Sequence, residues 1–595
     1  MKKRLILLLA LLVLCLCVHI SCEDNIQEPA ESESESVTQD LTDDNGAFVF
    51  FEGGVPKFTL VREERMSGAA LDSVIEFRNN LNSLADKDVD ITTDFSLEYL
   101  QTGEHNSDAY EIVIGKSNYT EAEELYAQTA TGEYVIKVIG KKIFVYSFED
   151  TGIIYAVNRL WEAISAAYDD TTGSASLGVA DIEYTKNYNE TMSLIPTVDG
   201  LDCDSVNDCG DGSSMMIYKK ATEEIFDAYV GKVRESGYKH HSSREMENNK
   251  FVTYYCDELI LNAMYLPATK EIRVITDDNS KYDLPMIDKE YDESKKVCDS
   301  LLIQVGTSPA DNESQNGQCY LIRCEDGGFI VYDGGWEGNQ SGATPRNNLT
   351  RLYNTLKEYT PSGMKPRINA WVLTHAHGDH TGLFAKFVQN YRSAVDVEQF
   401  VINFPSDNDT VSVENDGAAR YKKILNAIST YYKNSEVIKI HTGNYFKYAN
   451  VEMECLYTIE LFLPKQDSYF NTTSTVTRLF VGDQNILMAG DMSADANEII
   501  RRHFKDYIKS DFYQVTHHGS LGGSDEFNRL CDPLWALWPC GYTLFETHKS
   551  KNTSRVQYLL HSPTVKKNFI AGFRTTVINL PFDGKEASYV EYDNK

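Results

Sequence analysis

Three histidines and one aspartate occur within six residues of this chain, and all four side chains can bind a metal ion. They are His375, His377, Asp379 and His380. Neutral imidazoles and carboxylates are ligands that suit zinc and neighbouring divalent metals. On a regular strand or helix these spacings would spread the side chains over different faces, whereas on a turn they can converge. The sequence therefore predicts a metal site on a turn.

Regular secondary structure is expected on both sides of this turn. Residues 368–373 form an apolar run that predicts a buried strand, and a helical pattern opens at residues 381–384. The four side chains would then lie where a strand ends and a helix begins. The alternative is a polar loop that holds three histidines by chance, because short motif matches carry false positives.

This first motif resembles the signature of the metallo-β-lactamase fold superfamily. Two later motifs follow in the family's order, each after an apolar run: Gly490-Asp491 and His517-His518-Gly519-Ser520. The last form is typical of the branch that includes competence-type hydrolase domains and some surface phosphodiesterases. The resemblance implies one or two bound Zn²⁺ ions, with Mn²⁺ or Fe²⁺ as alternatives. The metal ligands that it implies are His375, His377, Asp379, His380, Asp491 and His517.

Only one of the two adjacent histidines in the last motif is expected to bind metal directly. If the strand that begins at Phe512 continues to Thr516, successive side chains point to opposite faces of the sheet. We therefore assign His517 as the ligand and His518 to a supporting or substrate-facing position. Asp379 and His518 are the candidate catalytic residues, Asp379 because it can also orient the attacking hydroxide.

One histidine of the family pattern has no clear counterpart. Many members carry another histidine between the first motif and the bridging aspartate, and here that interval holds only His441. Because it comes early, we interpret it as a surface histidine at a strand end, with a ligand role as the alternative. Asn471 or a water is expected to take the family histidine's place. Asp333, in a Tyr-Asp-Gly-Gly turn, resembles an early family aspartate that supports the ligands; a plain turn is the alternative.

The implied reaction is hydrolysis by a metal-activated hydroxide. Two divalent ions can lower the pKa of a shared water and stabilise the leaving oxygen, so no protein nucleophile is needed. An ester or phosphodiester of a surface or glycan-linked molecule is the favoured substrate class. Lactone or lactam hydrolysis is the first alternative. A glycan-binding surface protein with a degenerate hydrolase domain is the second.

The first residues predict export. Met1-Lys2-Lys3-Arg4 and the apolar run after it form a secretory signal, which we place at residues 1–22. The residues before Cys22 resemble a loose bacterial lipobox, so Cys22 is the candidate lipid anchor and the only expected link to a membrane. Residues 23–45 are acidic and rich in Ser and Glu, which is typical of a disordered tether. Several Asn-x-Ser/Thr sequons keep a secreted eukaryotic protein as the alternative.

Charge and cysteine content limit the function further. The formal net charge of −33 makes nucleic acid an unlikely partner, because binding to phosphates depends on Lys and Arg. The twelve cysteines show no zinc-finger or disulfide framework. Cys203 and Cys209 could close a local disulfide, but buried thiols are expected in general. Nothing in the sequence indicates an oligomeric state.

Three globular units are expected, which places the chain among mixed α/β and α+β multidomain proteins. Residues 46–190 alternate strands and helices and resemble the small α/β accessory domain of some carbohydrate-active enzymes, with a plain spacer as the alternative. Residues 191–290 predict a small α+β domain. Residues 295–595 carry every ligand motif and suit a metallo-β-lactamase-like αββα sandwich. We therefore expect the chain from about Lys295 onward to keep metal binding and turnover by itself.

Overall fold

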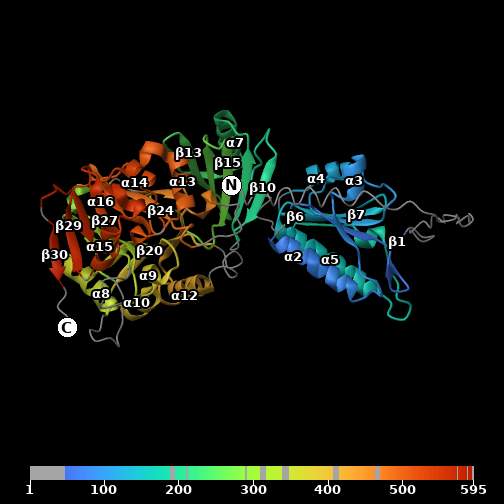
Figure 1. Cartoon of the computed structure of the whole chain (residues 1–595), viewed down its shortest axis with the longest axis horizontal. Coiled ribbons are helices and arrows are strands. Elements are labelled where there is room, and N and C mark those ends of the chain that lie inside the picture. The colour runs from blue at the N-terminus through green and yellow to red at the C-terminus, as the bar shows by residue number, and fades with distance from the viewer. Residues whose placement is uncertain are drawn as a thin grey trace, which may run out of the picture.

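A computed structural model of the chain describes most residues from 47 to 591. The residues outside the description are 1–46, 67, 131, 188–193, 210–211, 288–290, 308–316, 338–346, 406–414, 463–469, 521, 573, 586 and 592–595. The predicted signal segment, its anchor candidate Cys22 and the acidic segment 23–45 therefore lie outside the described residues. The described part folds into three units with five sheets (Figure 1), which confirms the predicted mixed α/β multidomain class.

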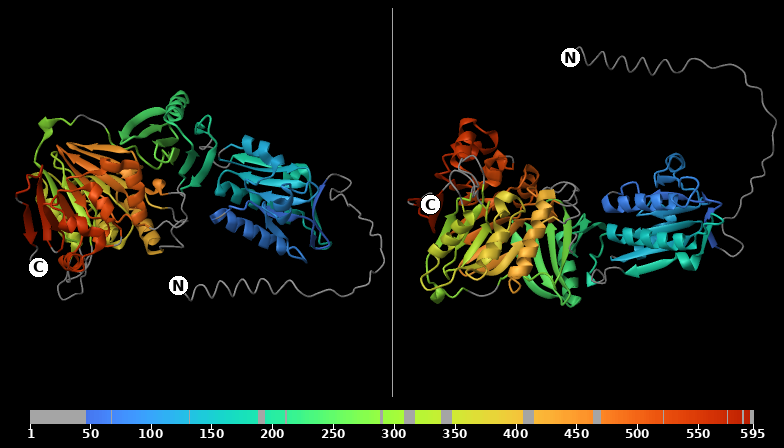
Figure 2. Two further views of the ribbon diagram at one scale, coloured as in Figure 1. Left: turned by 45° about the horizontal axis from the view of Figure 1, so that its top comes forward. Right: turned by 90° about the horizontal axis from the view of Figure 1, so that it is seen from below.

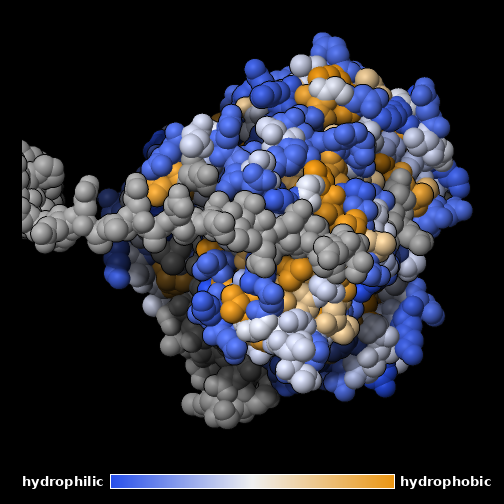
Figure 3. Space-filling view, turned by 90° about the vertical axis from the view of Figure 1, so that its right-hand side faces the viewer, coloured by the Kyte–Doolittle hydropathy of each residue, from blue (hydrophilic) through white to orange (hydrophobic). Residues whose placement is uncertain are grey.

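The first unit is a sheet covered by two long helices on one face. Its six-stranded sheet has the order β4-β3-β5-β7-β6-β9, beside a small sheet β2-β1-β8. Side chains alternate across the larger sheet: Ile112 and Ile114 pack under α2 and α5, and Val113 faces the α4 side. The end face of this unit is mainly hydrophilic with smaller hydrophobic areas (Figure 3).

The bounds of its elements follow. The strands are β1 (Ala47–Glu52), β2 (Val55–Pro56), β3 (Thr59–Arg62), β4 (Ile91–Thr93), β5 (Glu111–Ile114), β6 (Glu133–Ile139), β7 (Lys142–Ser147), β8 (Ala175–Gly178) and β9 (Tyr184–Asn187). The helices are α2 (Gly68–Asn82), α3 (Leu97–Thr102), α4 (Glu123–Gln128), α5 (Asp150–Ala167) and α6 (Val179–Ile182).

The second unit is an antiparallel sheet with one helix. Its strand order is β10-β11-β15-β14-β13-β12. Thr222 caps the helix, because its side chain accepts a hydrogen bond from the Ile225 amide. The elements are β10 (Cys203–Asp208), β11 (Ser214–Lys219), α7 (Glu223–Glu235), β12 (Lys239–Met246), β13 (Asn249–Tyr255), β14 (Leu259–Leu266) and β15 (Glu271–Asp278).

The third unit contains two large sheets. The eight-stranded sheet runs β21-β20-β19-β18-β17-β16-β29-β30, and the seven-stranded sheet runs β22-β23-β24-β25-β26-β27-β28. The first is built from β16 (Ser300–Gln304), β17 (Cys319–Arg323), β18 (Phe329–Asp333), β19 (Arg367–Val372), β20 (Asp396–Ile402), β21 (Glu436–Lys439), β29 (Arg574–Leu580) and β30 (Ser588–Glu591). The second is built from β22 (Tyr445–Tyr448), β23 (Val451–Tyr457), β24 (Val476–Val481), β25 (Gln484–Met488), β26 (Phe512–Gln514), β27 (Trp535–Trp538) and β28 (Lys567–Ile570).

Helices cover the outer faces of both sheets, which gives the predicted four layers (Figure 2). Ala370 and Val372 of β19 point into the core between the sheets, whereas Trp371 points outward into the core under the helices. This alternation is what a strand buried on both faces requires. The helices are α8 (Asn348–Tyr359), α9 (Gly378–Thr381), α10 (Phe384–Tyr391), α12 (Asn415–Tyr431), α13 (Ala494–Phe504), α14 (Asp525–Cys531), α15 (Tyr542–Ser550) and α16 (Gln557–His561).

The second and third units share one hydrophobic core. One face of the second unit's sheet, with Met215 and Phe251, packs with Leu461 and Phe504 of the third unit. The opposite face packs on α7. By contrast, the buried clusters of the first unit contain residues of that unit alone. A chain that begins at Lys295 would therefore expose an apolar surface that the intact protein buries, which differs from the independence expected from the sequence.

A buried charged cluster also joins the second and third units. His441 is 2% exposed, and its Nε2 lies 2.7 Å from the Asp277 carboxylate of β15. The carboxylate of Glu460 lies 3.7 Å from His441 Nδ1, and Lys439 lies 3.5 Å from Asp277. The expectation of a surface histidine is thus wrong, because an aspartate of the neighbouring unit covers His441. Burial alone would lower the pKa of His441, but the two carboxylates raise it to about 9.

No disulfide occurs among the nine cysteines of the described residues, so Cys203 and Cys209 are not joined. Five of these cysteines are buried. Within the same part of the chain, no helix has the length and apolar character needed to cross a membrane.

The shared core predicts how the chain tolerates truncation. Removal of residues 1–193 should leave a protein with a cooperative melt, because the first unit has its own core. Removal of residues 1–294 should lower the melting temperature strongly or cause aggregation, since each large apolar side chain that loses its cover forfeits roughly 1.5–3 kcal/mol. Calorimetry of the two truncated proteins and the full chain makes the comparison. Equal melting temperatures for the two truncated proteins would contradict the shared core.

The buried cluster predicts a pH dependence of stability. The pKa of His441 is higher in the folded protein than in the unfolded chain, so its contribution is complete below about pH 6.5 and disappears as pH rises through about 9. That contribution is on the order of 3 kcal/mol. His441→Gln should therefore lower the urea midpoint at pH 6 much more than at pH 9.5. His240→Gln, at an exposed histidine, is the matched control and should show no such difference.

Candidate metal centre

The predicted ligands come together at one edge of the two sheets. β19 and β20 run parallel to β18 in the first sheet, and β26 runs parallel to β25 in the second, so the carboxyl ends of these strands share an edge. The first motif follows β19 and enters α9, as the sequence predicts. Asp491 follows β25, and the two adjacent histidines follow β26. Loops from both sheets therefore build the site.

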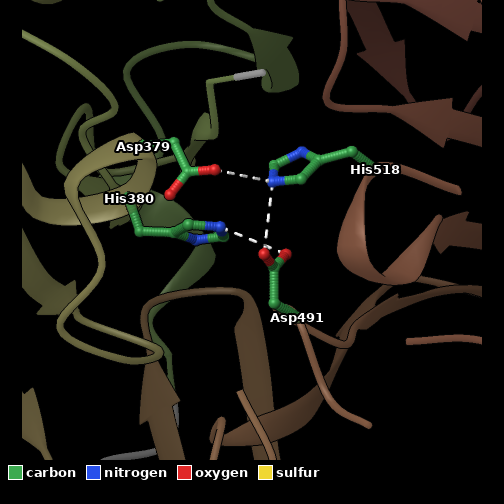
Figure 4. A group of neighbouring side chains, drawn as sticks. All are labelled: Asp379, His380, Asp491 and His518. Atoms are coloured by element: carbon green, nitrogen blue, oxygen red, sulfur yellow. Dashed lines mark hydrogen bonds and ion pairs between the residues drawn. The ribbon is translucent and has the colours of Figure 1, made fainter. Parts of the chain in front are cut away.

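Four of these side chains form a compact group (Figure 4). Each of Asp379, His380, Asp491 and His518 offers one ligand atom, and these atoms all lie within 4.8 Å of one another. His518 Nε2 is 3.1 Å from an Asp379 oxygen and 3.2 Å from an Asp491 oxygen. His380 Nε2 is 3.1 Å from the other Asp491 oxygen. Two imidazoles and two carboxylates facing one point are a donor set that suits a divalent metal.

Asp333 orients the first motif, as expected for a supporting aspartate. Its carboxylate accepts hydrogen bonds from the Thr374 amide at 2.8 Å, the Thr374 hydroxyl at 2.8 Å and Gln318 Nε2 at 2.8 Å. The same carboxylate lies 2.7 Å from His380 Nδ1, which must donate. The Nε2 of a neutral His380 is therefore left with its lone pair directed toward Asp491. Asp333 holds this position with a φ of 55°, a conformation that non-glycine residues rarely adopt.

A backbone carbonyl orients His518 in the same way. Its Nδ1 lies 2.7 Å from the oxygen of Pro539, which can only accept a hydrogen bond. The Nε2 atom of neutral His518 is thus the free ligand atom, and it points to Asp379 and Asp491. The side chain is fully buried.

Further candidate ligands adjoin this compact group. His375 Nε2 is 3.1 Å from His377 Nδ1 and 4.0 Å from an Asp491 oxygen. His517 Nε2 is 3.9 Å from that same Asp491 oxygen. Asn471 Nδ2 lies 3.5 Å from His517 Nε2, and the side-chain oxygen Oδ1 of Asn471 is buried without a hydrogen bond. Asn471 is therefore adjacent to the candidate metal centre, and its role in place of the family histidine stays a prediction.

The two adjacent histidines differ from the expected pattern because the strand ends early. β26 stops at Gln514, and residues 516–519 form a 3₁₀ turn. His517 and His518 both have positive φ, 48° and 56°. Strand alternation does not apply to such residues, so both side chains can reach the site. The structure places His518 in the compact group and His517, with 20% of its side chain exposed, outside it, 3.9 Å from Asp491.

Electrostatics favour cation binding at this site. Burial and the neighbouring histidines hold the pKa of His375 well below its usual value, so it is a neutral ligand. Burial alone would raise the pKa of Asp491, but His380 and His518 lower it well below the usual range. The same contacts, with Asp379, raise the pKa of His518 to about 9 despite burial. Without a metal, protons on the imidazoles compensate the charge of the carboxylates. A divalent cation bound at the site would replace these protons.

The buried atoms also fit a metal. His380 Nε2 and an oxygen of Asp491 are buried, and their 3.1 Å contact lacks the angles of a hydrogen bond. Two nitrogens bound to one tetrahedral zinc lie about 3.3 Å apart, given zinc–nitrogen distances of about 2.0 to 2.1 Å. The separation of 3.1 Å between the ring nitrogens of His375 and His377 is close to this value.

A glycine makes the approach of the two loops possible. Gly490 precedes Asp491 and has a φ of 52°. A Cβ at this position would lie 3.1 Å from the Cβ atoms of both Ser474 and Thr374. The absence of a side chain therefore lets the loop after β25 contact the loop after β19.

Comparison with known proteins identifies the C-terminal unit. Residues 315–447 match the family model described as Metallo-beta-lactamase superfamily, which covers the first motif and Asp333. The third unit thus carries a metallo-β-lactamase superfamily domain. A search of curated proteins found no match.

Several solved structures are similar to part of the chain. The metallo-beta-lactamase fold protein YhfI from Bacillus subtilis is 13% identical over 49% of this chain and 100% of that chain, with a TM-score of 0.30. The diiron beta-hydroxylase CmlA from Streptomyces venezuelae is 12% identical over 47% of this chain and 54% of that chain, with a TM-score of 0.27. The short form of human tRNase Z is 12% identical over 40% of this chain and 90% of that chain, with a TM-score of 0.25.

Some residues that support the candidate ligands were not predicted from the sequence. Gln318 and Thr374 bind Asp333, and the Pro539 carbonyl orients His518. Thr374 precedes the first motif directly, so its position was a usable signal. Gln318 and Pro539 are far from the motifs in sequence, and their contacts depend on how the strands pair.

The two histidines should have separable effects on metal content. Because His518 belongs to the compact group and His517 lies outside it beside Asn471, His518→Ala and His517→Ala should each lose about one equivalent of a two-metal centre. Mass spectrometry of the intact proteins and elemental analysis measure the loss. His561→Ala, at an exposed histidine of the same unit, should keep full metal content. Loss confined to His517→Ala would instead support the assignment made from strand alternation.

Proposed function

We propose that this protein is an exported metal-dependent hydrolase that cleaves an ester or phosphodiester of a surface or glycan-linked substrate. The observation that carries the proposal is the convergence of candidate ligands on the Asp491 carboxylate. Asp379, His380 and His518 form the four-residue group with Asp491. His375 and His517 lie 4.0 and 3.9 Å from the Asp491 oxygen that His518 also approaches. A buried carboxylate that more ligands approach than one metal needs suits a two-metal hydrolytic centre.

The chain's own residues position the reactants. Bound divalent ions would lower the pKa of a water and stabilise charge on the leaving oxygen. His518 holds one oxygen of Asp379 at 3.1 Å, and 19% of the Asp379 side chain remains exposed. Asp379 can therefore orient an attacking water and accept its proton. The buried His375, His380 and His518 keep the inner side of the centre dry, which strengthens these interactions.

The proposed cellular location comes from the sequence. The apolar N-terminal segment and Cys22 support export and a lipid anchor at the cell surface. The first unit, which resembles accessory domains of carbohydrate-active enzymes, would then direct the hydrolase to a glycan-linked substrate. The net charge of −33 supports a partner other than nucleic acid.

A substrate panel tests the proposed reaction. The protein loaded with Zn²⁺, Mn²⁺ or Fe²⁺ should hydrolyse a chromogenic phosphodiester or carboxylic ester faster than a lactone or a β-lactam. Asp491→Asn should reduce turnover by at least about 100-fold, because a bridging amide cannot balance two cations. Asp506→Asn, at an exposed aspartate, serves as the control.

Each alternative has its own result in this panel. Faster turnover of a lactone or lactam would favour the lactone or lactam hydrolase. Bound metal below about 0.1 equivalent per chain, together with glycan binding, would favour a degenerate surface protein. An intact ligand set would bind metal tightly enough to stay well above that level. Full metal loading without turnover of any ester would reject the proposed substrate class.

A further inference from the structure

An arginine from a helix distant in sequence lies against the ligand loop. Arg420 belongs to α12, and a Cβ on Gly378 would lie 3.3 Å from its Nη2 atom. Gly378 separates His377 from Asp379, so the guanidinium is beside two candidate ligands. The ring of Trp336 covers the same glycine, 2.6 Å from the position of that Cβ. Only a glycine leaves room here for both side chains.

This guanidinium has no partner within the part of the chain that the structure describes. Arg420 is half-buried, and its Nε atom is buried without a hydrogen bond. It forms no ion pair with Asp379, although both adjoin Gly378. Leaving a buried donor unsatisfied costs free energy, so such groups are normally paired.

Other buried and half-buried arginines of the chain follow that rule. Arg478 lies 2.6 Å from Glu454, Arg273 lies 2.9 Å from Glu271, and Arg367 lies 2.6 Å from Asp326. In a chain with 89 acidic and 56 basic residues, carboxylate partners are plentiful. Within the described part of the chain, half-buried Arg78 has no carboxylate partner but bonds to the Val89 carbonyl. Arg420, next to the metal centre, has neither kind of partner among the described residues.

We propose that Arg420 binds an anionic oxygen of the substrate beside the metal centre. This inference rests on the proposed hydrolytic function and narrows its substrate class to molecules with a negatively charged group near the scissile bond. A guanidinium presents its donors in a planar fork that matches phosphate and carboxylate oxygens. A phosphodiester supplies such an oxygen on the reacting group itself, and a substrate carboxylate supplies it on a neighbouring atom.

Kinetics on three chromogenic substrates test the role of Arg420. Bis(p-nitrophenyl) phosphate carries charge on the reacting group, the β-lactam nitrocefin carries a carboxylate, and p-nitrophenyl acetate is neutral. Arg420→Gln should raise KM for the charged substrate that the enzyme uses by about tenfold or more, as expected for loss of a charged hydrogen bond. KM for the neutral ester should change less than about twofold, the scale of a surface substitution. Arg420→Lys should give an intermediate KM, because it keeps the charge and loses the fork.

A control on the same helix separates local binding from overall charge. Lys423 is exposed on α12, so Lys423→Gln removes one positive charge away from the ligand loop. This variant should leave KM for all three substrates unchanged. Metal content should be the same in every variant.

Several outcomes would overturn the proposal. An equal effect of Arg420→Gln on charged and neutral substrates, or a loss of bound metal, would show that Arg420 supports the fold of the ligand loop. No effect on the charged substrates would show that it does not contact them. A raised KM for the phosphodiester alone identifies phosphate as the bound group, and a raised KM for the lactam alone identifies a carboxylate.

A binding measurement keeps this inference separate from the proposed function. If the metal-loaded protein turns over none of the three substrates, the proposed function fails, but orthophosphate binding can still be measured by calorimetry. Arg420→Gln should then weaken orthophosphate binding by about tenfold, and Lys423→Gln should not. Equal orthophosphate affinity in the wild-type protein and Arg420→Gln would overturn the role of Arg420 independently of turnover.

Discussion

The contact on which the site depends is the buried Asp491 carboxylate. It follows a strand of the seven-stranded sheet, yet it lies 3.1 Å from His380, which follows a strand of the eight-stranded sheet. A carboxylate buried to this extent is stable only when opposite charge or hydrogen bonds compensate its lost hydration. The two sheets must therefore pack in one register, so that the histidines of one reach the aspartate of the other. The glycine before Asp491 allows the loops to approach closely enough for this contact.

Much of this arrangement could be predicted from the sequence. The apolar runs before the first motif and before Asp491 form strands β19 and β25, and α10 follows the motif at Phe384, although the short α9 already begins inside the motif at Gly378. These predictions succeed because hydrophobic periodicity and ligand spacing are local properties of the chain. The support given by Asp333 was also foreseen, and its bonds to Thr374 and His380 show how a turn residue fixes the ring of a ligand.

The remaining features depend on contacts between distant segments. His441 is buried because Asp277, in another unit, covers it, and no local pattern around His441 indicates this contact. The positions of His517 and His518 depend on two consecutive residues with positive φ, which an argument from strand alternation cannot include. Arg420 lies forty residues after the end of the first motif and reaches it only because α12 packs beside α9. The positions of these residues thus depend on packing between elements, which the periodicity of the sequence does not predict.

The buried cysteines give the fold a further chemical property. The described residues contain no disulfide, and burial raises the pKa of the Cys324, Cys455 and Cys531 thiols well above the usual value. The thiolate is the form that attacks disulfides and oxidants, so these buried thiols are poor nucleophiles at neutral pH. In the folded protein these thiols are therefore shielded from thiol reagents, and they become reactive only where the chain unfolds.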